Sequence, residues 1–201
     1  MSRMEAGRGQ SASLETWAAV AAATGSQLVS FLEEQPGATR PRDYEHLKRQ
    51  QLVATAAAPG GWQPTPERLV DPAWRRPRSV DVFLERPARR EFAVVEIVDL
   101  FADVGDVLRA LDAKVATVAR DLAARELAGA APGRVGGLLV VRGTRRNRAL
   151  VREFRALFEA RFGRRSSAWL TALRNPSHAL PEGHGLAWTD AGATRLIPAR
   201  L

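Results

Sequence analysis

Two acidic side chains lie in neighbouring apolar segments of this 201-residue chain, at a spacing that could bring them together. Asp81 belongs to "RSVDVFLE" (78–85) and Glu96 to "EFAVVEIVDL" (91–100). Both segments are rich in β-branched and aromatic residues, so we predict two strands of a hairpin. With residues 86–91 as the loop, the register places Asp81 opposite Glu96. Two opposed carboxylates repel each other unless a divalent metal or an arginine lies between them.

Side-chain alternation assigns the other hairpin residues to two faces. Phe83, Phe92 and Val94 share a half-buried face with the two acids. The opposite face is wholly apolar and is predicted to be buried; it consists of Val80, Val82, Leu84, Ala93, Val95 and Ile97.

Over roughly residues 40–145, this arrangement resembles the restriction-endonuclease-like fold of the PD-(D/E)xK superfamily. In that superfamily an Asp on one strand and a Glu-x-Lys on the next hold Mg²⁺ and activate a water for phosphodiester cleavage. Asp81 and Glu96 match the two acids, and the resemblance implies that they would be the metal ligands. Val98 stands where the superfamily has its lysine.

Lys114, in the helix expected after the hairpin, could replace the missing lysine, and Glu45 or Glu67 could supply a further acid. The alternative is structural. The two hairpin acids would then pair with local arginines such as Arg78 or Arg109, and Lys114 would keep its ammonium in solvent at the edge of its helix.

A second group of candidate residues follows a predicted helix cap at Thr144. In "RGTRRNR" the residues Arg145, Arg146 and Arg148 fall in the first helical turn, where each cation is disfavoured by about 0.3–1 kcal/mol. Such a group either stays solvated or gathers around an anion, and a nucleic-acid phosphate is the natural one. We therefore identify these three arginines as candidate DNA-backbone contacts.

The stretch "SRMEAGRG" and the Ala-rich segment after it resemble the end of an XRE (Cro-like, phage-repressor-type) helix-turn-helix domain. The first two helices and most of the recognition helix have no counterpart here. We expect that Met1 is an internal methionine or that the DNA-binding head was lost; the alternative is an ordinary N-terminal helix. Within the resemblance, only Ser2 and Arg3 could still contact DNA. The whole layout also resembles actinobacterial helix-turn-helix proteins of unassigned function.

Composition limits the remaining function classes. The chain has no cysteine, which excludes disulfides and thiolate metal sites, and its formal net charge of +8 favours a polyanionic partner. Apolar segments are too short to span a bilayer, so we expect no membrane partner and a cytoplasmic location.

The elements that must position these residues form an α/β pattern. We predict a helix-turn-helix remnant over 1–35 and a restriction-endonuclease-like domain with a mixed central sheet over 36–201. Apart from the hairpin, the expected helices are 13–24, 42–56, 103–126, 145–162 and 166–173, and the expected strands are 26–34, 134–142, 185–190 and 194–198.

These observations lead us to interpret the chain as a DNA-associated, transcription-regulatory protein with a catalytically inactive nuclease-like core. One alternative is a Mg²⁺-dependent DNA endonuclease that uses Asp81, Glu96 and Lys114, with the two acids as metal ligands. Another is an interaction module that forms a homodimer. No cofactor is predicted apart from Mg²⁺ in the nuclease alternative.

Overall fold

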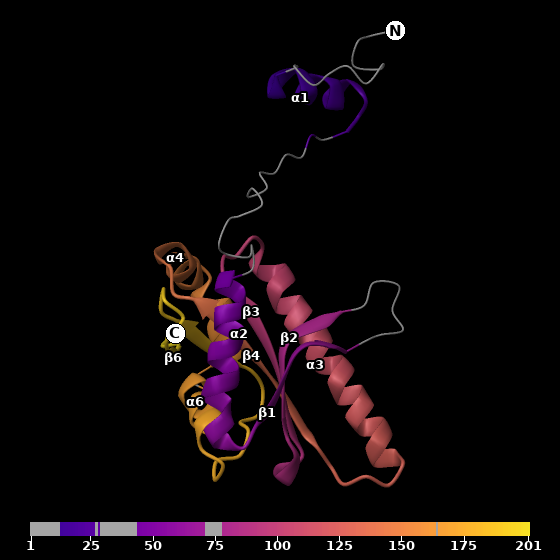
Figure 1. Ribbon diagram of the computed structural model, residues 1–201, viewed down its shortest axis with the longest axis vertical. Coiled ribbons are helices and arrows are strands. Elements are labelled where there is room, and N and C mark those ends of the chain that lie inside the picture. Colours follow the sequence, from indigo (N-terminus) through magenta and orange to yellow (C-terminus); the bar gives the residue numbers. More distant parts are fainter. Residues whose placement is uncertain (1–12, 27, 29–43, 71–77, 164) are drawn as a thin grey trace. The chain divides into compact units, whose positions relative to one another are not determined.

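The computed structural model describes residues 13–26, 28, 44–70, 78–163 and 165–201 (Figure 1). The chain divides into two compact units, Met1–Pro41 and Arg42–Leu201. The predicted domain boundary between residues 35 and 36 lies outside the described residues, as does most of the strand expected over 26–34.

The first unit contains helix α1 (Leu14–Ala23), which confirms the helix predicted over 13–24. The Ser13 hydroxyl accepts a hydrogen bond from the backbone N–H of Thr16 at 3.3 Å and caps the helix. Gly25 follows its end with φ +69°, a conformation that glycine adopts without strain. None of the residues of α1 is buried.

The second unit is built on a six-stranded mixed sheet, which confirms the predicted α/β class. The strands follow one another in chain order across the sheet. The first three are antiparallel, the third to fifth are parallel, and the sixth is antiparallel to the fifth. Their bounds are β1 (Gln63–Leu69), β2 (Ser79–Arg86), β3 (Glu91–Val98), β4 (Arg134–Arg142), β5 (Gly185–Thr189) and β6 (Leu196–Pro198).

Five helices of this unit complete a three-layer arrangement: α2 (Tyr44–Ala57), α3 (Val104–Leu127), α4 (Arg145–Glu153), α5 (Arg155–Phe162) and α6 (Ser166–Arg174). Apolar side chains of α2 and α6 pack on one face of the sheet. Those of α3, α4 and α5 pack on the other, so α2 and α3 lie on opposite sides of the strands (Figure 1). Within the described residues, no helix is both long and apolar enough to cross a membrane.

The chain following β4 differs from its prediction. Instead of one helix over 145–162, α4 ends at Glu153 and α5 begins at Arg155. Phe154 between them has a ψ of 31°, which lies outside the helical range. Phe154 and Leu157 are large apolar residues of the predicted helix, yet each is 45 % exposed. The break lets Phe158 and Phe162 enter the core on the α3 side of the sheet.

Strand β1 is absent from the sequence-based prediction. Its residues include Pro64 and Pro66, and proline cannot donate to a ladder of backbone hydrogen bonds. The strand is tolerated because it lies at the edge of the sheet, where only one neighbour has to be paired.

The two faces of the hairpin also differ in part from the prediction. Phe83, Phe92 and Val94 are buried beneath α3 rather than half-buried. Val80 packs in this same cluster, on the face opposite to the one predicted for it. Val80 and Val82 are two residues apart and would share a face in a regular strand, but they pack on opposite faces of the sheet. The strand is therefore irregular at Asp81.

A buried ion pair closes the loop end of the hairpin. The Arg86 guanidinium pairs with the Glu91 carboxylate, and their side chains are only 3 % and 5 % exposed. Glu91 also accepts a hydrogen bond from the backbone N–H of Leu180 at 2.9 Å. The remaining Arg86 donors bind backbone carbonyls of Gly60, Ala172, Asn175 and His178, which belong to the segments around η1 (Ala58–Gly60) and the end of α6. The pair therefore joins the hairpin to the α2 side of the unit.

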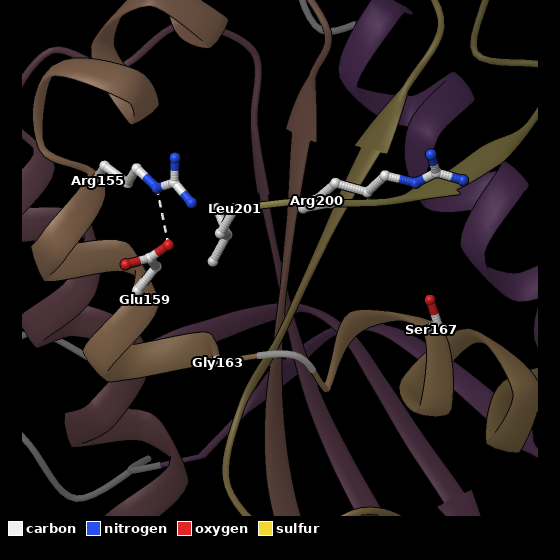
Figure 2. Close-up of a pocket in the computed structure, with 7 residues that line it drawn as sticks. Arg155, Glu159, Gly163, Ser167, Arg200 and Leu201 are labelled. Atoms are coloured by element: carbon white, nitrogen blue, oxygen red, sulfur yellow. Dashed lines mark hydrogen bonds and ion pairs between the residues drawn. The ribbon is translucent and has the colours of Figure 1, made fainter.

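Replacing Arg86 by Met should lower the free energy of unfolding by about 3–5 kcal/mol, because Glu91 would remain buried without its cation. The exposed pair of Arg155 and Glu159 in α5 offers a matched control (Figure 2). Arg155→Met should cost less than about 1 kcal/mol. Urea denaturation followed by circular dichroism measures both changes, and equal losses would show that burial of the first pair has no energetic consequence.

Candidate functional site

β2 and β3 pair in the predicted register as far as Val82 and Val95. The prediction that Asp81 and Glu96 share one face is wrong, because Asp81 faces His46 of α2 and Glu96 faces Lys114 of α3. At the row of these two acids the strands lose their regular backbone pairing. Instead, the Oδ2 atom of Asp81 accepts a hydrogen bond from the backbone N–H of Ile97 at 2.6 Å. The Asp81 side chain thus takes the place of a backbone acceptor between the two strands.

Strand β1 brings a third acid to the same row. Its register on β2 places Glu67 opposite Asp81, and Glu67 has φ +51°, unlike an ordinary strand residue. Its carboxylate accepts a hydrogen bond from the Gln50 side chain of α2. Glu67, Asp81 and Glu96 therefore follow one another across three strands, and we call these three residues the carboxylate row.

A lysine of α3 compensates the negative charge of Glu96. The Nζ atom of Lys114 lies 2.5 Å from its Oε2 atom, and both side chains are 13 % exposed. Burial raises the pKa of Glu96 to about 7, and the nearby charge of Asp81 acts in the same direction. The Lys114 ammonium and the backbone N–H of Asp81 oppose this rise. Two of the residues that the sequence nominated for catalysis, Glu96 and Lys114, thus form a pair, and the Glu96 side chain also meets the backbone N–H of Asp81.

Asp81 is compensated from the opposite side, by a histidine that the sequence did not nominate. The Nε2 atom of His46, in the first turn of α2, lies 3.6 Å from Asp81 Oδ1. Its Nδ1 atom lies 3.6 Å from Oδ2 of Asp99, just after β3. The pKa of His46 is raised, chiefly by its interaction with Asp81, while burial acts against that rise. The two carboxylates therefore favour the protonated form of His46.

A fully buried arginine fixes the helix that carries this histidine. Arg49 of α2 places its guanidinium 2.7 Å from Asp99 Oδ1 and donates from Nε to the Thr189 hydroxyl at 3.3 Å. It also contacts the carbonyl and the carboxylate of Glu45 within its own helix. Because Asp99 and Thr189 lie at the ends of β3 and β5, Arg49 ties α2 to the sheet beside the carboxylate row.

These side chains surround a pocket of about 750 Å³, which we call the acidic pocket. Its lining includes both residues that the sequence offered as a further acid, Glu45 and Glu67. The full lining is Glu45, His46, Leu47, Glu67, Asp81, Asp99 and Arg142. An acidic, partly open pocket of this kind is suited to holding a cation.

The candidate DNA contacts begin α4 close to this pocket. Thr144 caps the helix as predicted, accepting a hydrogen bond from the backbone N–H of Asn147 at 3.0 Å. The buried Asn147 side chain donates to the carbonyls of Asp99 and Arg142 and accepts from the backbone N–H of Phe101. It therefore holds the start of α4 against the ends of β3 and β4, where the acidic pocket opens.

The three nominated arginines of α4 are all exposed at this helix start. Arg148 lies over the Trp188 ring at 4.8 Å from its centroid and donates to the Gly143 carbonyl at 3.3 Å. The other two nominated DNA contacts, Ser2 and Arg3, lie outside the described residues. Arg109, considered as a partner for the hairpin acids, instead pairs with Asp106.

Sequence reasoning missed His46, Arg49, Asp99 and Asn147. One signal was available: His46 and Arg49 are three residues apart, so they share a face of the predicted helix. The sequence could not show which strand ends that face would meet.

A second pocket, of about 630 Å³, is lined by α5, the start of α6 and the last residues of the chain (Figure 2). Its lining shares no residue with the acidic pocket and contains none of the nominated site residues. The Arg155–Glu159 pair lies at its edge and balances its own charge.

Comparison with protein-family models, with curated proteins and with solved structures finds no match to this chain.

Glu96→Gln should change how stability depends on pH. The folded-state pKa of about 7 exceeds the ordinary value of 4.5, so the folded protein holds this proton more tightly than the unfolded chain does. The resulting stabilisation is complete below pH 4.5 and is lost as the pH rises toward 7. Between these two pH values the free energy of unfolding of the wild type, measured against that of Glu96→Gln, should fall by at most about 3 kcal/mol.

Urea denaturation at intervals of pH measures this difference, and a difference that stays constant from pH 4.5 to 7.5 would contradict it. Carboxyl NMR titration provides a second check. The midpoint for Glu96 should lie near 7 and should fall in Asp81→Asn, which removes the neighbouring negative charge.

Proposed function

We propose that this chain is a DNA-associated, transcription-regulatory protein whose α/β unit binds the phosphate backbone without cutting it. The observation that carries the proposal is the exposed cluster of Arg145, Arg146 and Arg148 at the start of α4. A helix N-terminus presents unpaired backbone N–H groups, so three cations placed there create a concentrated positive field. A phosphate group in contact with that field relieves the repulsion among the arginines.

The placement of the cluster supports the same proposal. Asn147 holds the start of α4 to the strand ends, so the arginines project from a fixed scaffold. Arg148 is oriented further by the Trp188 ring. Fixed cations lose little side-chain freedom on binding, and each phosphate that they neutralise releases condensed counterions.

The order of the elements supports a nuclease-like core. A helix, three antiparallel strands, a crossover helix and a parallel strand succeed one another, with Asp81 on the second strand and Glu96 on the third. This order agrees with the resemblance to the PD-(D/E)xK superfamily. Val98 packs against the apolar cluster on the α3 side, where it offers no charge for catalysis. That substitution is the reason for proposing binding without cleavage.

The triple variant Arg145→Ala, Arg146→Ala, Arg148→Ala should bind random duplex DNA more weakly than the wild type. The slope of the logarithm of affinity against the logarithm of salt concentration should also be smaller, because fewer counterions are released. Fluorescence anisotropy at several salt concentrations measures both quantities.

A matched control removes three exposed arginines of α3: Arg109, Arg120 and Arg125. The net charge changes equally in the two variants, which remove it from different helices. If both variants weaken binding equally, net charge alone drives association and the α4 cluster is not the DNA contact.

A second candidate function is Mg²⁺-dependent DNA cleavage, favoured by the 2.5 Å contact of Lys114 with Glu96. A metal held by Asp81 and Glu96 would polarise a phosphoryl oxygen and activate a water. The Lys114 ammonium, coming from α3 instead of from position 98, would offset the negative charge that develops on the phosphate.

Incubation with supercoiled plasmid and single-stranded DNA, in Mg²⁺ and then in Mn²⁺, separates the two candidates. If the protein binds without cutting, wild type and Asp81→Ala should leave the plasmid supercoiled. Nicking by the wild type that disappears in Asp81→Ala would replace the first proposal with the second. Nicking that persists in Asp81→Ala would identify a contaminating nuclease.

A further inference from the structure

Three potential metal ligands converge from three different elements at the acidic pocket. His46 comes from α2, Glu67 from β1 and Asp81 from β2, and each offers one ligand atom within 4.8 Å of the others. Metal ions bind imidazole nitrogen and carboxylate oxygen at about 2.0–2.2 Å, so neighbouring ligands of a tetrahedral ion are about 3.4 Å apart. The 3.6 Å between His46 Nε2 and Asp81 Oδ1 is close to that spacing.

Four carboxylates line the acidic pocket, from Glu45, Glu67, Asp81 and Asp99, against two basic side chains, His46 and Arg142. In the part of the chain that the structure describes, Arg49 and Lys48 form ion pairs with Glu45 or Asp99. Asp81 faces His46 instead, and Glu67 accepts from the neutral Gln50 amide.

Each of the three ligands is also held by a group outside the triad. The Gln50 amide orients Glu67, and the backbone N–H of Ile97 holds one oxygen of Asp81, leaving the other directed to His46. Asp99 lies at the second ring nitrogen of His46. A carboxylate at the far nitrogen is the usual support of a metal-binding histidine, because it fixes the ring orientation and raises the basicity of the ligand.

We propose that His46, Glu67 and Asp81 form a binding site for one divalent transition-metal ion, of which Mn²⁺ and Zn²⁺ are examples. Glu96 is not one of its ligands, since its carboxylate is engaged with Lys114 on the α3 side. One imidazole nitrogen with two carboxylates favours such ions over Mg²⁺, which prefers oxygen ligands in a strict octahedron. The acidic pocket, open to solvent, gives the ion access and supplies water for its remaining coordination positions.

The site shares Asp81 with the nuclease candidate, but its test requires neither proposed function, because metal binding can be measured without DNA. The probe is Mn²⁺, titrated into the metal-stripped full chain, with the free ion followed by its electron paramagnetic resonance signal. We expect one bound Mn²⁺ per chain, and an excess of Mg²⁺ should not displace it. A stoichiometry of zero, or displacement by equimolar Mg²⁺, would overturn the proposal.

Ligand variants test the assignment of residues. His46→Gln and Glu67→Gln should each raise the Kd for Mn²⁺ by about tenfold or more. His178→Gln and Glu159→Gln repeat the same chemical changes elsewhere and should leave the Kd unchanged. Glu96→Gln should raise the Kd for Mn²⁺ less than Glu67→Gln does. If Glu96→Gln raises it more, the metal ligands are Asp81 and Glu96 and the proposed site is wrong.

The three histidines of the wild-type chain give a readout that needs no destabilised variant. Bound Mn²⁺ broadens the NMR signals of nearby nuclei. At substoichiometric Mn²⁺ the imidazole signals of His46 should disappear first. The signals of His178 and of His184, which is held by Gly137 and Asp112, serve as internal references. If either reference broadens before His46, or all three broaden together, the proposed site is wrong.

Discussion

The negative charges of the carboxylate row must be compensated by other groups, and the elements of the α/β unit are placed so that they do this. Three acids on adjacent antiparallel strands repel one another, and the repulsion is strongest at Glu96, whose side chain is largely buried. Compensation comes from both layers: Lys114 reaches Glu96 from α3, and His46 reaches Asp81 from α2. Within the sheet itself, a backbone N–H is diverted to Asp81. The placement of both helices therefore has electrostatic as well as apolar causes.

The row and the buried pair of Arg86 and Glu91 lie at opposite ends of the same hairpin, with apolar residues between them. A slip of one residue in register would turn the acids of the row toward the apolar clusters and separate Arg86 from its partner. Each alternative register would leave charge buried without compensation, which costs several kcal/mol. Charged groups thus select the register, while the apolar side chains supply most of the driving force for folding.

Periodic patterns explain which parts could be predicted from the sequence. The strands carrying Asp81 and Glu96, their register and the long helix with Lys114 follow from regular spacing of apolar residues. β1 could not be predicted, because its prolines hide a strand that only an edge position permits. The role of His46 depends on which face of the sheet α2 covers, and local sequence carries no information about that contact.

The composition of β1 also bears on how copies of the chain can associate. An exposed edge strand normally offers a row of N–H and C=O groups to which another strand can add. Here two of the seven residues are prolines and a third, Glu67, is turned into the left-handed region. An incoming strand would therefore find an incomplete set of donors and a negatively charged interruption. Joining of sheets through this edge is disfavoured, so strand-by-strand polymerisation is hindered on the β1 side of the unit.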